Sequence, residues 1–250
     1  MPSTSQFLPP SQSDLKNNDR LLPSQPVMRQ FFNGAEAEFY PGLERVTNSV
    51  LPIGSIHEKW DIQLKPGVTY ETLGSDLSCL HLLQFLIHFG RCKRVLEIGT
   101  YIGVSTLFLA EAVGEDGRVV TIEVGAEFAE IARDNFRRNG LLDRIELIHG
   151  DAVAALSALR ERGELFDMIF LDGDKANYGR LLNLLLEFVR PGGVILVDDI
   201  FCNGDTLNAV PATSRGQGVQ EMLSQVAAFD GSPRVILPYG NGQLLLLKSS

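Results

Sequence analysis

The chain has 250 residues, of which 44% are hydrophobic and 21% charged, and its formal net charge is −9. This length suits one α/β domain with a sizeable core, and the composition is ordinary for a soluble globular protein. The negative charge argues against nucleic acid or an anionic membrane as a partner. The sequence also lacks the run of roughly 18 apolar residues that a membrane span needs.

The beginning of the chain and its cysteines indicate a cytoplasmic protein. Residues 1–26 are rich in Pro, Ser, Gln and Asn, which predicts a flexible tail, and they show no secretory signal. Residues 27–72 contain scattered prolines and predict a helical and loop-rich cap. The three cysteines are far apart without ligand-like spacing, which favours reduced thiols: Cys79, Cys92 and Cys202.

From residue 75 onward, apolar helices and strands alternate. A strongly apolar helix is expected over 75–90, closed by Gly90. Short apolar runs then predict strands, and 3.6-residue periodicity predicts the helices between them. The expected strands are 94–99, 117–123, 144–150, 166–172 and 192–199, and the expected helices are 104–113, 126–140, 152–163 and 178–190.

The end of the chain predicts a hairpin. A polar stretch at 202–216 and a helix near 217–229 precede two apolar runs, 234–238 and 243–248, joined by turn residues. We therefore expect an α/β fold of the doubly wound type, with a mainly parallel seven-stranded sheet, a C-terminal antiparallel hairpin and helices on both faces. Ligands bind beyond the carboxyl ends of such strands. Six acidic residues at or just past strand ends should face one cleft there: Glu97, Glu123, Asp151, Asp172, Asp198 and Asp199.

The turn after the first strand predicts a cofactor site. Its sequence has the spacing GxxxG, with Gly99 and Gly103, and Glu97 precedes it. Glycines allow a tight turn and a close approach to a ligand. A cationic sulfonium cofactor with an amino-acid tail suits that acid better than a pyrophosphate does, and Glu123 is placed to accept hydrogen bonds from a ribose. The alternative is a plain strand–turn–helix junction.

Four motifs in register resemble the cation-dependent O-methyltransferases that use S-adenosylmethionine (SAM), the group of catechol and caffeoyl-CoA O-methyltransferases. They are VLEIGTYIGVS, VVTIEV, FLDGDKANY and VDDIFCNG, and the resemblance spans roughly residues 73–250. It implies a Rossmann-like class I methyltransferase domain over 73–250.

The resemblance also implies roles by position. The loop that holds the methionine part of SAM corresponds to Glu97, Gly99, Tyr101, Gly103 and Ser105. Glu123 corresponds to the acid that binds the ribose, and Asp151 and Ala152 to the turn beside the adenine. Asp172, also beside the cofactor, and Asp198 correspond to carboxylate ligands of a divalent metal, and Lys175 to the lysine that accepts the substrate's proton.

Asp199 departs from the family pattern, in which an asparagine follows the first aspartate of this pair. A third carboxylate would then join Asp172 and Asp198 around a divalent cation, with Mg²⁺ expected first and Ca²⁺ or Mn²⁺ as alternatives. Alternatively, Asp199 caps the following segment or points into water. The alternative interpretation of Lys175 is a solvated surface lysine.

The implied reaction is displacement at the methyl carbon of SAM by a hydroxyl of a small molecule with two neighbouring oxygens. A phenol has a pKa near ~10, so a metal that lowers this value would make it a better nucleophile. We expect a homodimer, and the acceptor stays open. Two other functions also stay open: metal-independent methyl transfer, and SAM binding without catalysis.

Overall fold

The computed structural model describes residues 56–65, 67, 75–229 and 231–249. The expected tail over 1–26 and most of the expected cap over 27–72 lie outside this part of the chain. The described piece of the latter holds helix α4 (Ile56–Lys59) and a segment without regular structure up to residue 65. Among the helices in the described ranges, none has the length and apolar character to cross a membrane.

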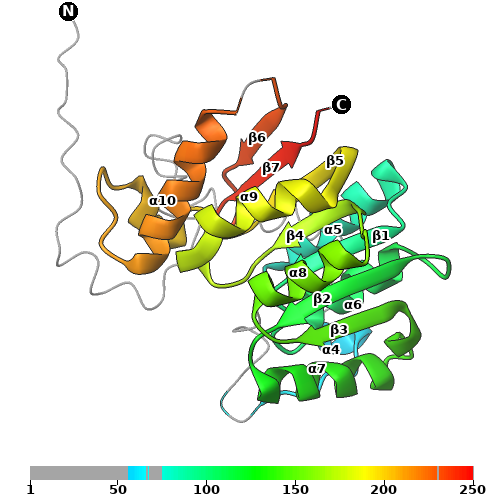
Figure 1. The fold of residues 1–250 in the computed structure, drawn as a ribbon. Helices are drawn as coiled ribbons and strands as arrows, with labels where there is room; N and C mark the ends of the chain where they lie inside the picture. Colours follow the sequence, from blue (N-terminus) through cyan, green and yellow to red (C-terminus); the bar gives the residue numbers. More distant parts are fainter. Residues whose placement is uncertain (1–55, 66, 68–74, 230, 250) are drawn as a thin grey trace, which may run out of the picture.

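A seven-stranded sheet forms the centre of the fold, with the strand order β3-β2-β1-β4-β5-β7-β6 (Figure 1). Strands β1 to β5 pair in parallel, whereas β7 pairs antiparallel with both β5 and β6. The order changes direction between β1 and β4, which is where open α/β sheets bind ligands. The strands are β1 (Arg94–Ile98), β2 (Arg118–Glu123), β3 (Ile145–His149), β4 (Phe166–Leu171), β5 (Val189–Val197), β6 (Arg234–Leu237) and β7 (Gln243–Leu247).

Helices cover both faces of the sheet, as the sequence predicts, and each face has its own apolar core. In Figure 1, α8 and α9 lie in front of the sheet, and α5 and α6 lie behind it. Helices α4, α5, α6 and α7 contribute to one core, and α8, α9 and α10 contribute to the other. Beyond α4, the helices are α5 (Leu77–Gly90), α6 (Val104–Ala112), α7 (Ala126–Arg138), α8 (Ala152–Glu161), α9 (Tyr178–Phe188) and α10 (Ser214–Ala227).

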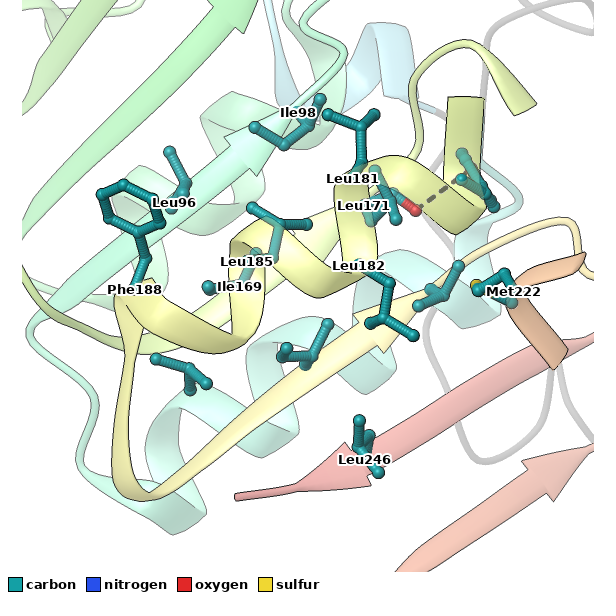
Figure 2. Packing of buried hydrophobic residues seen from close by; sticks show 14 of the residues in the cluster. Leu96, Ile98, Ile169, Leu171, Leu181, Leu182, Leu185, Phe188, Met222 and Leu246 are labelled. Atoms are coloured by element: carbon teal, nitrogen blue, oxygen red, sulfur yellow. Dashed lines mark hydrogen bonds between the residues drawn. The ribbon is translucent and has the colours of Figure 1, made fainter. Parts of the chain in front are cut away.

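The central strands serve both cores because successive side chains point to opposite faces of a sheet. Leu96 and Ile98 of β1 belong to the core under α8, α9 and α10, whereas Val95 belongs to the other core. Figure 2 shows leucines of α9 over Ile169 and Leu171 of β4. The hydroxyl of Tyr178 at the start of α9 donates a 3.2 Å hydrogen bond to the carbonyl of Leu171. This packing fixes the carboxyl end of β4, where Asp172 follows.

The largest differences from the expected boundaries are at the starts of β5 and α10. Helix α9 ends at Phe188, and β5 already begins at Val189, although we expected the helix to reach residue 190. Arg190 precedes Pro191, and a residue before proline disfavours the helical conformation, so the chain extends earlier and Val189 pairs with Phe166. Helix α10 begins at Ser214 because Thr213 caps it by accepting a hydrogen bond from the backbone N–H of Gly216.

Candidate active site

A cavity of about 360 Å³ opens at the carboxyl ends of β1, β2, β3 and β4, as expected for this architecture. Its wall includes seven residues that the sequence predicts for the cofactor site: Gly99, Tyr101, Ser105, Glu123, Asp151, Ala152 and Asp172. The loops that follow four parallel strands thus converge on one volume.

The loop after β1 approaches the end of β4 so closely that residue 99 must be glycine. Gly99 has a φ of +102°, and a Cβ there would overlap the backbone carbonyl of Asp172. Gly103 has a φ of +88°, and a Cβ there would overlap the ring of Phe136. Between them, Tyr101 also has a positive φ of 50°. Gly99 and Tyr101 both line the cavity.

Glu123 connects two loops of the cavity wall. One carboxylate oxygen accepts a 2.7 Å hydrogen bond from the backbone N–H of Tyr101, and the other accepts a 2.8 Å bond from the N–H of Gly125. A carboxylate has about four lone-pair sites, so each oxygen keeps one for a ligand hydroxyl. Glu123 lies at the end of β2, is 8% exposed and lines the cavity.

Asp151 caps the helix at the far end of the cavity wall. Its Oδ1 accepts hydrogen bonds from the backbone N–H groups of Val153 and Ala154, at 3.0 and 3.1 Å. Such a cap satisfies N–H groups that a helix leaves unpaired in its first turn. The turn before α8 is thereby fixed, with Asp151 and Ala152 facing the cavity.

Glu97 lies below the cavity rather than in its wall. Its side chain is fully buried, and its carboxylate accepts hydrogen bonds from the hydroxyls of Ser105, Thr106 and Thr121. Burial raises the pKa of this carboxyl to about 7 against the opposing effect of these hydrogen bonds. Among the described residues, Glu97 therefore supports the loop through Ser105 and does not face the cleft as we expected.

Lys175 joins two of the three aspartates expected to bind metal. Its Nζ lies 2.8 Å from Oδ1 of Asp172 and 3.0 Å from Oδ2 of Asp199. Burial opposes the charged form of Lys175, but the charges of Asp172 and Asp199 raise the pKa of its ammonium above the ordinary value. Lys175 is buried, so it is not the solvated surface lysine of the alternative interpretation.

Asp198 is the most buried of the three aspartates, with 3% exposure. Its Oδ1 accepts hydrogen bonds from the backbone N–H of Asp199 and from Nε2 of Gln243, at 2.9 and 3.1 Å. Burial, followed by the charges of Asp172 and Asp199, raises the pKa of Asp198 to about 7. Three carboxylates thus share one region at the ends of β4 and β5.

These side chains fit a hard divalent cation in donor type and in charge, because carboxylate oxygens are its preferred ligands. Burial is the main cause of the raised pKa of Asp198, and the negative charges of Asp172 and Asp199 add to it. Their arrangement is not that of a preformed site, however. In residues 56–65, 67, 75–229 and 231–249, no group of three or more His, Cys, Asp and Glu side chains is placed to hold a metal ion.

Several wall residues escape sequence reasoning. Ser75 lines the cavity and donates a 3.2 Å hydrogen bond to Oδ2 of Asp172. Asn177 and Arg180 also line it. They lie three residues apart, and residues at this spacing share one face of a helix, so the pattern after Lys175 could have indicated them. Tyr101 lines the cavity, whereas Trp60, the single tryptophan of the chain, packs edge-on against Phe108 in the core.

A sequence model of the O-methyltransferase family matches residues 70–249. The chain belongs to this family. Over 117 residues it is 42% identical to catechol O-methyltransferase of Mycobacterium tuberculosis, a match that covers 47% of this chain and 52% of that relative. It is 31% identical over 176 residues to caffeoyl-CoA O-methyltransferase 1 of Eucalyptus globulus, covering 67% of this chain and 72% of the relative. The family expected from the four motifs is confirmed.

Solved structures of the family support the fold and the cofactor. An O-methyltransferase from Bacillus cereus in complex with SAH has a TM-score of 0.70 at 28% identity, and the match covers 83% of this chain and 97% of that one. TomG from Streptomyces achromogenes, an O-methyltransferase involved in tomaymycin synthesis and solved with SAM, has a TM-score of 0.68 at 27% identity, covering 84% and 96%. Membership of this family supports SAM-dependent O-methyl transfer as the chemistry of the cavity.

Proposed function

We propose that this protein transfers the methyl group of SAM to a hydroxyl of a small molecule that carries two neighbouring oxygens, such as a catechol, with the help of a divalent cation. The observation that carries the proposal is the position of Asp172. It lines the cavity and also pairs with Lys175 in the carboxylate cluster, so the cofactor cavity and the cluster share this residue. A methyl group in the cavity would therefore lie close to the polar groups that prepare an acceptor.

In this proposal each loop of the cavity wall binds one part of SAM. The loop with Gly99, Tyr101 and Gly103, together with Ser105, would hold the methionine part. Glu123 has a free lone pair on each oxygen for the ribose hydroxyls. Asp151 and Ala152 would flank the adenine at the start of α8.

Asp172, Asp198 and Asp199 would hold the cation, with Mg²⁺ expected first and Ca²⁺ or Mn²⁺ as substitutes. A divalent cation bound there would lower the pKa of the acceptor's hydroxyl. Lys175 would accept the proton of that oxygen. In the described arrangement the two aspartates stabilise its ammonium form. If a cation took up the charge of Asp172 and Asp199, burial would favour the neutral form of Lys175, which is the form that acts as a base.

One observation favours a second candidate, methyl transfer without metal. The Lys175 ammonium already bridges Asp172 and Asp199 and partly neutralises them. In that case Lys175 would be a hydrogen-bond donor. The other carboxylate oxygen of Asp199 would be available to bind an amino group of the acceptor molecule.

The cofactor assignment has a direct test. Glu123→Ala should weaken SAM binding by about 1–3 kcal/mol, because charge-assisted hydrogen bonds to the ribose are lost. Isothermal titration of SAM into wild type and variant measures this difference. An unchanged dissociation constant would mean that Glu123 does not hold the cofactor.

The metal-dependent reaction is tested with a panel of catechols and vicinal hydroxy acids, by following SAH formation with Mg²⁺ and with a chelator. We expect turnover only with Mg²⁺, and none in Asp172→Ala or Asp198→Ala. The matched control is Asp116→Ala, in the turn before β2, at the amino ends of the parallel strands and away from the cavity, and it should keep full turnover. Turnover that survives the chelator supports the second candidate. SAM binding with no methylated product under any condition would contradict both.

A further inference from the structure

The turn between β6 and β7 contacts the segment that follows the acid pair. The backbone N–H of Ile200 donates a 3.0 Å hydrogen bond to the carbonyl of Gly242, and the N–H of Phe201 donates a 2.8 Å bond to the carbonyl of Asn241. The side-chain Oδ1 of Asn241 accepts a third bond, of 2.7 Å, from the N–H of Asn203. The segment from residue 200 to 203 is thus bound by a turn about forty residues further along the chain.

This segment needs external support because its backbone is disfavoured. Asp199, Cys202 and Asn203 have φ values of 60°, 45° and 55°, in the left-handed region that side chains other than glycine rarely adopt. Such conformations persist only where surrounding contacts determine them. The hydrogen bonds to Asn241 and Gly242 contribute to this support, together with the bond from the Thr206 hydroxyl to the carbonyl of Ile200 and the ion pair of Asp199 with Lys175.

Gln243, the first residue of β7, extends the same support to the acid pair. It is 2% exposed, and its Nε2 donates a 3.1 Å hydrogen bond to Oδ1 of Asp198. The backbone N–H of Asp199 donates to the same oxygen. With Oδ1 bound in this way, the rotation of the Asp198 carboxylate is fixed, and the direction of Oδ2 is fixed with it.

The turn is itself anchored on its other side to α5. The hydroxyls of Tyr239 and Ser78 are 2.9 Å apart, and Gly240 lies so close to Asp76, the capping residue of α5, that a Cβ would overlap its carboxylate. The turn therefore connects a rigid helix end to the disfavoured segment.

We propose that the turn from Tyr239 to Gln243 is a positioning element of the active site, in which Gln243 orients Asp198 and Asn241 holds residues 201–203, which directly follow the acid pair and would form one side of the acceptor site. The role of Asp198 as a metal ligand rests on the proposed function; the orientation of its carboxylate does not. Neither Gln243 nor Asn241 is among the residues that line the cofactor cavity, so both act through the groups that they hold.

The first test is Gln243→Leu, which removes the amide donor and keeps an apolar side chain of similar length. Groups that orient a ligand typically change metal affinity about 10–100-fold when they are removed. We therefore expect the dissociation constant of Mn²⁺, measured by titration with electron paramagnetic resonance, to rise within that range. The SAM dissociation constant should stay within about twofold of wild type, since the cavity is untouched. A crystal structure of metal-free Gln243→Leu should show the Asp198 side chain rotated.

The second test concerns Asn241. Asn241→Ala removes the acceptor of the Asn203 N–H and should raise the KM for the acceptor with little change in SAM affinity. Asn241→Asp retains an oxygen at that place and should restore the KM. Gln225→Leu, which removes a side-chain amide on α10 that bonds to Asn183 and Glu221, is the matched control and should behave as wild type.

The outcomes are distinguishable. If Gln243→Leu leaves both the Asp198 rotamer and the Mn²⁺ affinity unchanged, the proposed orienting role is wrong. If wild type binds SAM but no divalent ion, the metal part of the proposed function fails, and the Asp198 rotamer alone decides the role of Gln243. If Asn241→Ala and Asn241→Asp give the same acceptor KM, Asn241 does not position the segment.

Discussion

A single buried carboxyl, that of Glu97, makes the stability of the fold depend on pH. Its pKa of about 7 in the folded protein lies above the ordinary value, so the folded protein binds its proton more tightly than the unfolded chain does. The stability that this proton contributes is present at low pH and is lost as the pH rises from the unfolded pKa through the folded one. The free energy of unfolding should therefore fall with increasing pH across this window.

Glu97→Gln should remove this slope. The variant cannot ionise, so its free energy of unfolding, compared with wild type, should rise between about pH 5 and pH 8, by at most about 1.4 kcal/mol per pH unit. Urea denaturation of both proteins at several pH values measures the difference. The comparison cancels the other groups that titrate in the same range, such as Asp198. Parallel pH profiles for the two proteins would mean that Glu97 titrates normally.

Asp199 offers a second prediction at this scale. Asp199→Asn restores the amide of the family pattern, and asparagine tolerates the φ of 60° at this position. Removing one negative charge should loosen Mg²⁺ binding. The same change removes one of the two charges that stabilise the Lys175 ammonium, so turnover at saturating Mg²⁺ should be kept or raised.

The measurements are isothermal titration of Mg²⁺ and initial rates across Mg²⁺ concentrations, with Asp116→Asn as the control. If Asp199→Asn leaves Mg²⁺ affinity unchanged, Asp199 is not a ligand. Its contact with Lys175 would then be its main role.

At the scale of elements, the sequence predicts what depends on local pattern and misses what depends on distant contacts. The strands and helices after residue 93 are found by periodicity, and the hairpin by its turn residues. The start of β5 is missed because pairing between Val189 and Phe166, together with Pro191, overrides a helical pattern. The sequence prediction wrongly places Glu97 in the cleft, because its position at a strand end does not reveal that three hydroxyls from other elements bind its carboxylate. Gln243 is missed because its partner, Asp198, lies 45 residues away.

The loop after β1 gives the prediction for this scale. Gly99→Ala adds a Cβ that overlaps the carbonyl of Asp172, whereas Gly140→Ala adds one at a φ of +66° with nothing within 4 Å. Gly140→Ala should therefore cost only the positive-φ strain, about 1–2 kcal/mol. Gly99→Ala should cost about 1–3 kcal/mol more, because the overlap moves β1 away from β4. Chemical denaturation measures both, and equal losses would show that the two strand ends adjust freely.

For the molecule as a whole, the sheet makes the two cores interdependent. The same strands supply side chains to both apolar cores, so loss of one helical layer exposes strands that the other layer needs. We therefore expect the described domain to unfold in one transition. The single tryptophan, Trp60, lies in the core of α4 to α7, so its fluorescence reports on one face, whereas circular dichroism reports on the whole chain. The two signals should change together.

Mild core substitutions test this interdependence. Ile87→Val on one face and Ile169→Val on the other should each lower the free energy of unfolding by about 0.5–1.5 kcal/mol. The two side chains lie on opposite faces, so the double variant should be additive within about 0.5 kcal/mol, although fluorescence and circular dichroism shift together. Ile195 pairs with Ile169 on the adjacent strand and faces the same core, so a double variant of these two is the comparison in which non-additivity is expected. If Ile87→Val moves the fluorescence transition but not the circular dichroism transition, the two faces unfold separately, and the sheet does not couple them.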